Sequence, residues 1–251
     1  MKFTGERVIP NKTPKSIFNE HISRYDFAAK FVINKVVLDI ACGTGYGSAY
    51  LLKKGRAKKV YGGDISPEAI NYAKKKYRNK KLFFKVMDAT KMPFKNNFFD
   101  VIISFETIEH ISEYTEFLCE CKRVLKKNGR IIISTPNKIV SSPLTKNPCN
   151  PFHVKEFYLQ EFKEILNNFF VVENIYGQKL IRNTLLFKLK LLICLMIIKI
   201  KKVFPKISKI NNKSFIKIKR VKRNSLDKIL PVKNIKGKTQ PTYIIVIAKK
   251  K

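Results

Sequence analysis

Three aspartates and a glycine-rich turn have the spacing of a nucleoside-binding site. Asp39, Asp64 and Asp88 each lie at the end of a short apolar segment, and Gly43-Thr44-Gly45-Tyr46-Gly47 follows the first of them. Glycine adopts positive φ easily, so such a turn can lie flat against a ligand. A carboxylate about 20 residues beyond the turn, as Asp64 is, can accept hydrogen bonds from both hydroxyls of a ribose. The pattern predicts that a nucleoside binds at the ends of neighbouring strands.

The spacing of the glycines separates this pattern from two common nucleotide sites. A nicotinamide-binding turn normally reads Gly-x-Gly-x-x-Gly, because its third glycine lets the helix pack against the strand. Here the glycines stand at positions 43, 45 and 47, and the P-loop pattern Gly-x-x-x-x-Gly-Lys-Ser/Thr does not occur in the chain. Met87-Asp88-Ala89 would place a carboxylate beside the adenine amino group. The expected ligand is an adenosine that carries no phosphate chain.

The elements that must position these residues alternate between strand and helix patterns. Runs rich in apolar and β-branched residues predict strands, and apolar residues at helical spacing predict helices. Residues 16–31 are expected to form a helix. The helix that follows the fourth strand is expected to end at Gly129, which would cap it. The alternation predicts an α/β fold, a mostly parallel sheet with helices on both faces. The expected strands are residues 36–40, 59–64, 82–88, 98–104, 130–135, 169–176 and 241–248.

The chain is strongly basic, but its charge is unevenly distributed. Its 251 residues include 52 lysines and arginines against 18 acids, a net charge of +34. Residues 179–251 hold 22 of the basic residues and one acid, Asp227, a charge of +21 that leaves +13 for the rest. Such a surplus is compatible with nucleic-acid binding. Lysine, asparagine, isoleucine and phenylalanine are all abundant, however, as an AT-rich genome imposes, and we favour that interpretation.

The first residues and the cysteines predict a cytoplasmic protein. Residues 1–7 contain no apolar segment of the kind found in secretory signals. The five cysteines are an odd number, and Cys119-x-Cys121 has no second pair with which to form a zinc site. Free thiols in a reducing compartment are therefore expected.

Five motifs, in this order and at this spacing, resemble those of the class I S-adenosylmethionine-dependent methyltransferases. Within that superfamily, residues 105–111 resemble the branch of the ubiquinone-biosynthesis O-methyltransferases. Residues 3–7, 21–25, 134–137 and 150–157 are similar to bacterial methyltransferases encoded among surface-polysaccharide genes. The five motifs are residues 38–45, 63–66, 87–89, 99–104 and 125–130.

The resemblance implies a Rossmann-like sheet of seven strands with a reversed seventh strand, and S-adenosyl-L-methionine as cofactor. It implies that Asp39 and the glycine turn hold the methionine part, and that Asp64 takes the ribose hydroxyls. Asp88 would contact the adenine amino group, and residues 104–106 would line the end of the site where the methyl group is transferred. The cofactor-binding residues so implied are Asp39, Ala41, Gly43, Gly45, Asp64, Ile65, Asp88, Ala89 and Ser104.

Three side chains are candidates for catalysis, namely Glu106, His110 and His153. Methyl transfer from a sulfonium depends on alignment, and a hydroxyl acceptor also benefits from a base within hydrogen-bond reach. For His153, in a loop rich in proline and asparagine, a catalytic base and a hydrogen-bonded loop residue are equally good interpretations. Glu106 is expected either to contact substrate or to cap a helix, and an architectural role is favoured for His110. A metal site formed by these three residues is an alternative, but none is predicted.

The chain divides into four predicted segments. They are an N-terminal lid or helix over residues 1–34, a methyltransferase core over 35–178, an insertion over 179–239, and the final strand with a lysine tail over 240–251. On the first segment, Arg24 or Tyr25 would meet an anionic group if the helix covers the ligand. If the helix instead packs across the sheet edge, Arg24 would be solvated.

The insertion has two interpretations. Residues 191–198 are apolar without interruption, too few for a membrane span of roughly 20 residues, and residues 199–223 are densely basic. Residues 185–223 could therefore form an interfacial helix and a polycationic stretch on anionic lipid at the inner membrane face. A helix packed on the domain, with lysines extended to solvent, is slightly favoured.

Taken together, the sequence predicts O-methylation of a small-molecule or glycan hydroxyl. The alternative is an RNA-directed methyltransferase, or a polyanion-binding protein without catalysis that uses the basic C-terminal region. The basic region has few aromatic residues on which bases could stack, which makes nucleic acid the less favoured partner.

Overall fold

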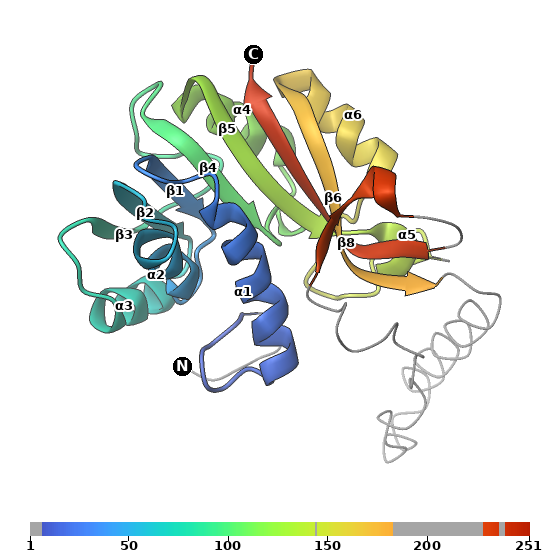
Figure 1. Ribbon diagram of the computed structural model, residues 1–251, viewed down its shortest axis with the longest axis horizontal. Coiled ribbons are helices and arrows are strands. Elements are labelled where there is room, and N and C mark those ends of the chain that lie inside the picture. The colour runs from blue at the N-terminus through green and yellow to red at the C-terminus, as the bar shows by residue number, and fades with distance from the viewer. Residues whose placement is uncertain (1–6, 144, 183–227, 236–238) are drawn as a thin grey trace.

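The computed structural model describes residues 7–143, 145–182, 228–235 and 239–251 (Figure 1). The predicted insertion therefore lies largely outside the described residues, and so does the segment 185–223 considered for membrane contact. In the part of the chain that is described, no helix is both long and apolar enough to cross a membrane.

An eight-stranded sheet forms the centre of the protein, in the order β3-β2-β1-β4-β5-β8-β6-β7. The first five strands are parallel, and β8 runs antiparallel to both β5 and β6. The reversed strand near the C-terminus was thus predicted correctly. The strands are β1 Val36–Ile40, β2 Lys59–Asp64, β3 Leu82–Val86, β4 Phe99–Phe105, β5 Leu125–Pro136, β6 Phe170–Arg182, β7 Ile229–Pro231 and β8 Thr239–Lys250.

The expectation of seven strands was wrong by one. The additional strand, β7, pairs antiparallel with the outer edge of β6, where Tyr176 lies opposite Pro231. It has only three residues, which gives it no alternation of apolar and polar side chains to recognise in the sequence.

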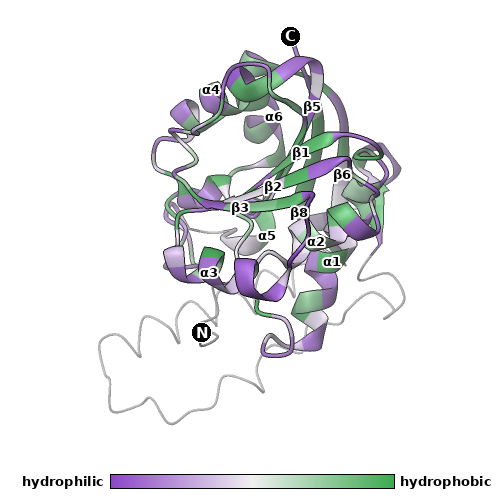
Figure 2. Cartoon of the chain, turned by 90° about the vertical axis from the view of Figure 1, so that its left-hand side faces the viewer, coloured by the Kyte–Doolittle hydropathy of each residue, from purple (hydrophilic) through white to green (hydrophobic). Residues whose placement is uncertain are grey.

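Helices cover both faces of the sheet because adjacent residues of a strand point to opposite faces. On one face α1, α2 and α3 contribute Ala28, Leu51 and Ile70 to a buried cluster that includes Val37. On the other face α4 and α6 pack against Leu38 and its neighbours. Figure 2 shows the strands as the hydrophobic interior of the molecule. The helices are α1 Lys15–Ala29, α2 Tyr46–Lys53, α3 Pro67–Lys76, α4 Tyr114–Val124, α5 Lys138–Ser141, α6 Leu159–Phe169, and the short 3-10 turns η1 Ile108–His110 and η5 Val232–Asn234.

The expected glycine cap at the end of α4 was also wrong. The helix ends at Val124, and Leu125 is already extended and begins β5. Phe99 pairs with Leu125 whereas Val101 pairs with Arg130, so residues 126–129 bulge out of the ladder. The positive φ in this bulge belongs to Asn128, at 65°, and not to Gly129.

Candidate active site

A cavity of about 270 Å³ opens where the parallel strands β1 to β4 end. The carboxyl ends of parallel strands are where open α/β sheets bind ligands. Seven of the predicted site residues line this cavity, and five further residues complete its wall. The predicted ones are Ala41, Asp64, Ile65, Asp88, Ala89, Glu106 and His110; the others are Arg7, Ile40, Met87, Thr107 and Ile111.

The glycine turn is fastened to Asp64. Gly43 N donates to Asp64 Oδ2 at 2.8 Å, and Ser66 N donates to Asp64 Oδ1 at 2.9 Å. Arg7 Nη2 lies 3.8 Å from Asp64 Oδ1, so the segment before α1 reaches over the same carboxylate. Both oxygens of Asp64 thus accept backbone hydrogen bonds on the cavity wall, and a carboxylate oxygen has a further lone pair for a ribose hydroxyl.

The backbone of the turn is held in conformations that favour glycine. Gly43 and Gly45 have φ of 54° and 78°, and Ala41 has φ of 58°. A Cβ on Gly45 would lie 2.7 Å from both Ala73 Cβ and a ring carbon of Phe84. Gly43 and Gly45 are not among the residues that line the cavity, and without side chains they could contact a cofactor only through their backbone.

Asp39 lies beneath the turn rather than on the cavity wall. It is fully buried, and it accepts hydrogen bonds from Ser48 Oγ at 2.5 Å and from Tyr25 Oη at 3.1 Å. Burial raises the pKa of Asp39 to about 7, against these two hydrogen bonds, which lower it. In this geometry Asp39 fixes α1 and α2 against β1, and its predicted contact with the methionine part stays a prediction.

The side of the cavity predicted for adenine is formed by the loops after β2 and β3. Ile65 is 70% exposed and offers an apolar surface. Asp88 Oδ1 accepts hydrogen bonds from Thr90 N and Thr90 Oγ1, both at 2.8 Å, and these bonds lower the pKa of Asp88. A carboxylate kept ionised in this way can accept from an amino group.

The opposite side of the cavity is formed by the end of β4. Glu106 has a left-handed φ of 52°, and such strain in a residue other than glycine is frequent at functional sites. Ser134 Oγ donates to Glu106 Oε1 at 2.6 Å, and Glu106 N donates to the Ser134 carbonyl oxygen at 3.2 Å. Ser104 is fully buried with an Oγ that has no partner among the described residues.

His110 and His153 come together next to the cavity, although 43 positions separate them in the chain. Their ring centroids lie 4.9 Å apart with the planes nearly perpendicular. Val154 N and Lys155 N donate to the Glu109 carbonyl oxygen at 2.8 Å and 3.1 Å, so the loop that carries His153 is tied to η1. The His153 loop thus lies against η1, and the role of His153 as base stays a prediction.

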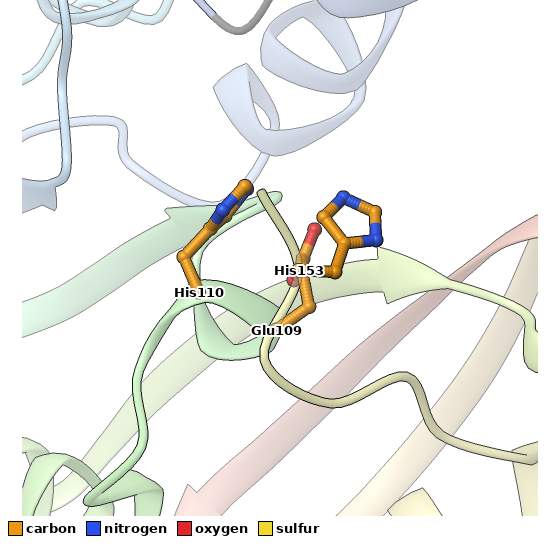
Figure 3. A group of neighbouring side chains, drawn as sticks. All are labelled: Glu109, His110 and His153. Atoms are coloured by element: carbon orange, nitrogen blue, oxygen red, sulfur yellow. The ribbon is translucent and has the colours of Figure 1, made fainter. Parts of the chain in front are cut away.

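Glu109, which is not one of the predicted site residues, completes a group that could hold a cation (Figure 3). One ligand atom from each of Glu109, His110 and His153 lies within 4.8 Å of the others. Glu109 Oε2 accepts from Thr135 Oγ1 at 3.0 Å, whereas the buried Oε1 has no partner among the described residues. Burial and the nearby Glu106 raise the pKa of Glu109. Two imidazoles and a carboxylate are ligands that zinc accepts.

Arg24 is a buried cation outside the wall of the cavity, close enough to Glu109 to act electrostatically on its carboxyl group. It is 0% exposed, its Nη1 donates to Gln178 Oε1 at 2.7 Å, and its guanidinium lies 4.7 Å from the centroid of the Tyr243 ring. Its Nε and Nη2 have no partner among the residues that the structure describes. The expectation of a solvated Arg24 on a packed helix was therefore wrong, and the unpaired donors fit the other interpretation, contact with an anion.

Some of these residues carried no recognisable signal in the sequence. Glu109 and Glu156 become notable only when the β4–η1 turn and the loop after β5 are brought together, and Arg7 only when the N-terminal segment lies across Asp64. The family resemblance of residues 3–7, 105–111 and 150–157, which contain these three residues, is the one indication that the sequence offers.

A mostly parallel α/β sheet, a glycine turn after its first strand and an acid at the end of the second define a nucleoside-binding enzyme of the Rossmann type. Comparison with known proteins gives the particular family. Residues 38–133 match the model of a methyltransferase domain. A probable S-adenosylmethionine-dependent methyltransferase of Mycolicibacterium smegmatis is 31% identical over 179 residues, which span 70% of this chain and 68% of that protein. The chain belongs to the class I S-adenosylmethionine-dependent methyltransferases, and S-adenosylmethionine is its cofactor.

Two more distant similarities are consistent with this assignment. A ubiquinone/menaquinone biosynthesis C-methyltransferase of Desulfotalea psychrophila is 28% identical over 62% of this chain and 69% of its own length. A solved structure of a Pyrococcus horikoshii protein superposes with a TM-score of 0.61 at 18% identity, over 99% of this chain and 96% of that one. The second similarity supports the fold alone.

Proposed function

We propose that the protein transfers the methyl group of S-adenosylmethionine to a hydroxyl oxygen of a small molecule or glycan. The observation that supports this most is the position of His153 beside His110, which itself lines the cofactor cavity. A neutral imidazole is a suitable acceptor for the proton of a hydroxyl. The glycan class of acceptor rests on the resemblance of residues 150–157 to methyltransferases of surface-polysaccharide genes.

In the proposed complex the ends of the cofactor are held by different residues. Asp64 accepts hydrogen bonds from the ribose hydroxyls, and Ile65 and Asp88 contact the adenine. The carboxylate of the methionine part meets Arg24, whose Nε and Nη2 are donors without another partner among the described residues. Such contacts are charge-assisted on both sides and are among the strong hydrogen bonds of proteins.

The reaction is an in-line displacement at the methyl carbon. The bond between the acceptor oxygen and the methyl carbon forms as the bond from carbon to sulfur breaks, and S-adenosylhomocysteine leaves as a neutral sulfide. The acceptor proton passes to His153. Because the sulfonium is already a good leaving group, the protein contributes mainly alignment and a place for this proton.

The test is to incubate the protein with methyl-labelled S-adenosylmethionine and a host glycan extract, and to identify the labelled products by mass spectrometry. We expect label on a hydroxyl oxygen, with a loss of at least about 100-fold in rate for His153→Gln. The same variant should bind S-adenosylhomocysteine as the wild type does. Label found only on carbon or only on RNA would overturn the proposal.

A further inference from the structure

A buried carboxylate lies directly behind His153. Glu156 is 2% exposed, and its Oε1 lies 2.6 Å from His153 Nδ1. Ser141 Oγ donates to Glu156 Oε2 at 2.6 Å. A carboxylate oxygen is the acceptor in such a contact, so His153 Nδ1 carries the proton and donates it to Glu156 Oε1.

The same contact also determines that Nε2, the second ring nitrogen of His153, is unprotonated in the neutral ring. In a neutral imidazole that carries its proton on Nδ1, Nε2 holds the lone pair. Asn150 Nδ2 lies 2.8 Å from this nitrogen, and an amide N–H donates to such a lone pair. Both contacts of the ring therefore agree on one tautomer. Orientation of a functional histidine by a carboxylate or carbonyl at its other nitrogen is a common arrangement in proteins.

His110 has the same tautomer for a different reason. Its Nδ1 lies 2.9 Å from the Phe152 carbonyl oxygen, which can only accept, so Nδ1 again carries the proton. This partner belongs to the backbone, so a change of the Glu156 side chain does not remove it. His110 is therefore an internal reference for experiments on His153.

We propose that Glu156 is a positioning residue for methyl transfer, which holds His153 as the Nδ1–H tautomer and so leaves Nε2 as its basic nitrogen. Asn150 occupies Nε2 until the acceptor hydroxyl takes its place and gives its proton to this atom. The proposal rests on the proposed role of His153 as base. It adds that the tautomer of the base is fixed by residues of the loop after β5, and not by the residues that hold the cofactor.

The alternative is that Glu156 only anchors this loop, since Ser141 lies at the end of α5. Two variants separate the alternatives. Glu156→Ala removes the partner of Nδ1, whereas Ser141→Ala removes a hydrogen bond of Glu156 that is equally short but leaves the contact with His153 in place. If Glu156→Ala does not fold, Glu156→Gln keeps the side-chain volume and removes the charge.

The experiment is long-range ¹H–¹⁵N NMR on protein labelled at histidine, of which the chain has three. In the wild type and in Ser141→Ala we expect His153 to be protonated at Nδ1 and unprotonated at Nε2. In Glu156→Ala, and to a smaller extent in Glu156→Gln, the proton should be shared with or moved to Nε2, while His110 is unchanged. An unchanged His153 signal in a folded Glu156 variant would overturn the proposal.

The rate measurement distinguishes this proposal from the proposed function. With labelled cofactor and glycan extract, Glu156→Ala should reduce kcat at least about tenfold and leave the affinity for S-adenosylhomocysteine unchanged. A wild type that labels no hydroxyl would count against the proposed function, while the NMR result would still decide whether Glu156 sets the tautomer. A normal kcat in Glu156→Ala would contradict the positioning role.

Discussion

Replacing Arg24 with methionine should weaken cofactor binding without loss of stability. The variant loses the hydrogen bond to Gln178 and the contact with Tyr243, together about 1–3 kcal/mol. It also removes a fully buried cation, two nitrogens of which have no hydrogen-bond partner in the described part of the chain, and burial of an ion costs several kcal/mol. Methionine occupies a similar volume and is apolar. We therefore expect the free energy of unfolding of the ligand-free protein to be unchanged or raised by about 1–3 kcal/mol.

The effect on binding should depend on the carboxylate of the ligand. A hydrogen bond to a charged group contributes about 1.5–3 kcal/mol, so loss of two such bonds, from Nε and Nη2, should weaken binding by about 100-fold or more. Isothermal titration with S-adenosylhomocysteine measures this loss. Methylthioadenosine, which lacks the amino acid part, is the matched control and should bind both proteins equally. A destabilised Arg24→Met that binds both ligands as the wild type does would show that Arg24 is not the partner of the ligand carboxylate.

Three further predictions concern the turn, the buried acid and the histidine pair. Asp39 has a pKa of about 7 in the folded protein because it is buried, against an ordinary 3.8; the folded state thus retains a proton that the unfolded chain has released. Wild-type stability should fall by up to about 4 kcal/mol as the pH rises from about 4 through 7, and urea unfolding of Asp39→Asn should show a shallower fall. An equal slope in both would argue against a protonated Asp39. Gly45→Ala should cost at least about 1–3 kcal/mol, because φ is 78° and the added carbon meets Ala73 and Phe84; thermal unfolding checks this, and a neutral result would mean that the turn relaxes. Added Zn²⁺ should raise the melting temperature if Glu109, His110 and His153 bind it, with reversal by a chelator and no rise in His153→Gln; an equal rise in both proteins would place the ion elsewhere.

The strands and the position of the cavity could be predicted because their signals are local. Apolar runs such as residues 36–40 read as buried strands, and Asp64 ends one of them, so the topology brings the strand ends together without further information. The limits of α4 could not be read in this way, because the bulge at residues 126–129 depends on how β5 pairs with β4.

The polar networks could not be predicted, because their partners are distant in sequence. Arg24 was considered as an anion contact, but its burial depends on Gln178 and Tyr243, each more than 150 positions away. Glu156 could not be assigned a role from a loop sequence whose backbone path was unknown. Asp39 shows the opposite outcome. Its motif predicted a contact with the cofactor, but the residue lies beneath the cavity, where Tyr25 and Ser48 donate hydrogen bonds to its two oxygens.

Titration of S-adenosylhomocysteine into the wild type and into Asp64→Ala shows whether Asp64 holds the cofactor, with Asp100→Ala as the control. Asp100 does not line the cavity, and its carboxylate accepts hydrogen bonds from Val36 N and Lys126 Nζ. We expect one bound molecule per chain for the wild type and for Asp100→Ala, and at least about tenfold weaker binding for Asp64→Ala. Binding by Asp64→Ala with undiminished affinity would contradict this expectation.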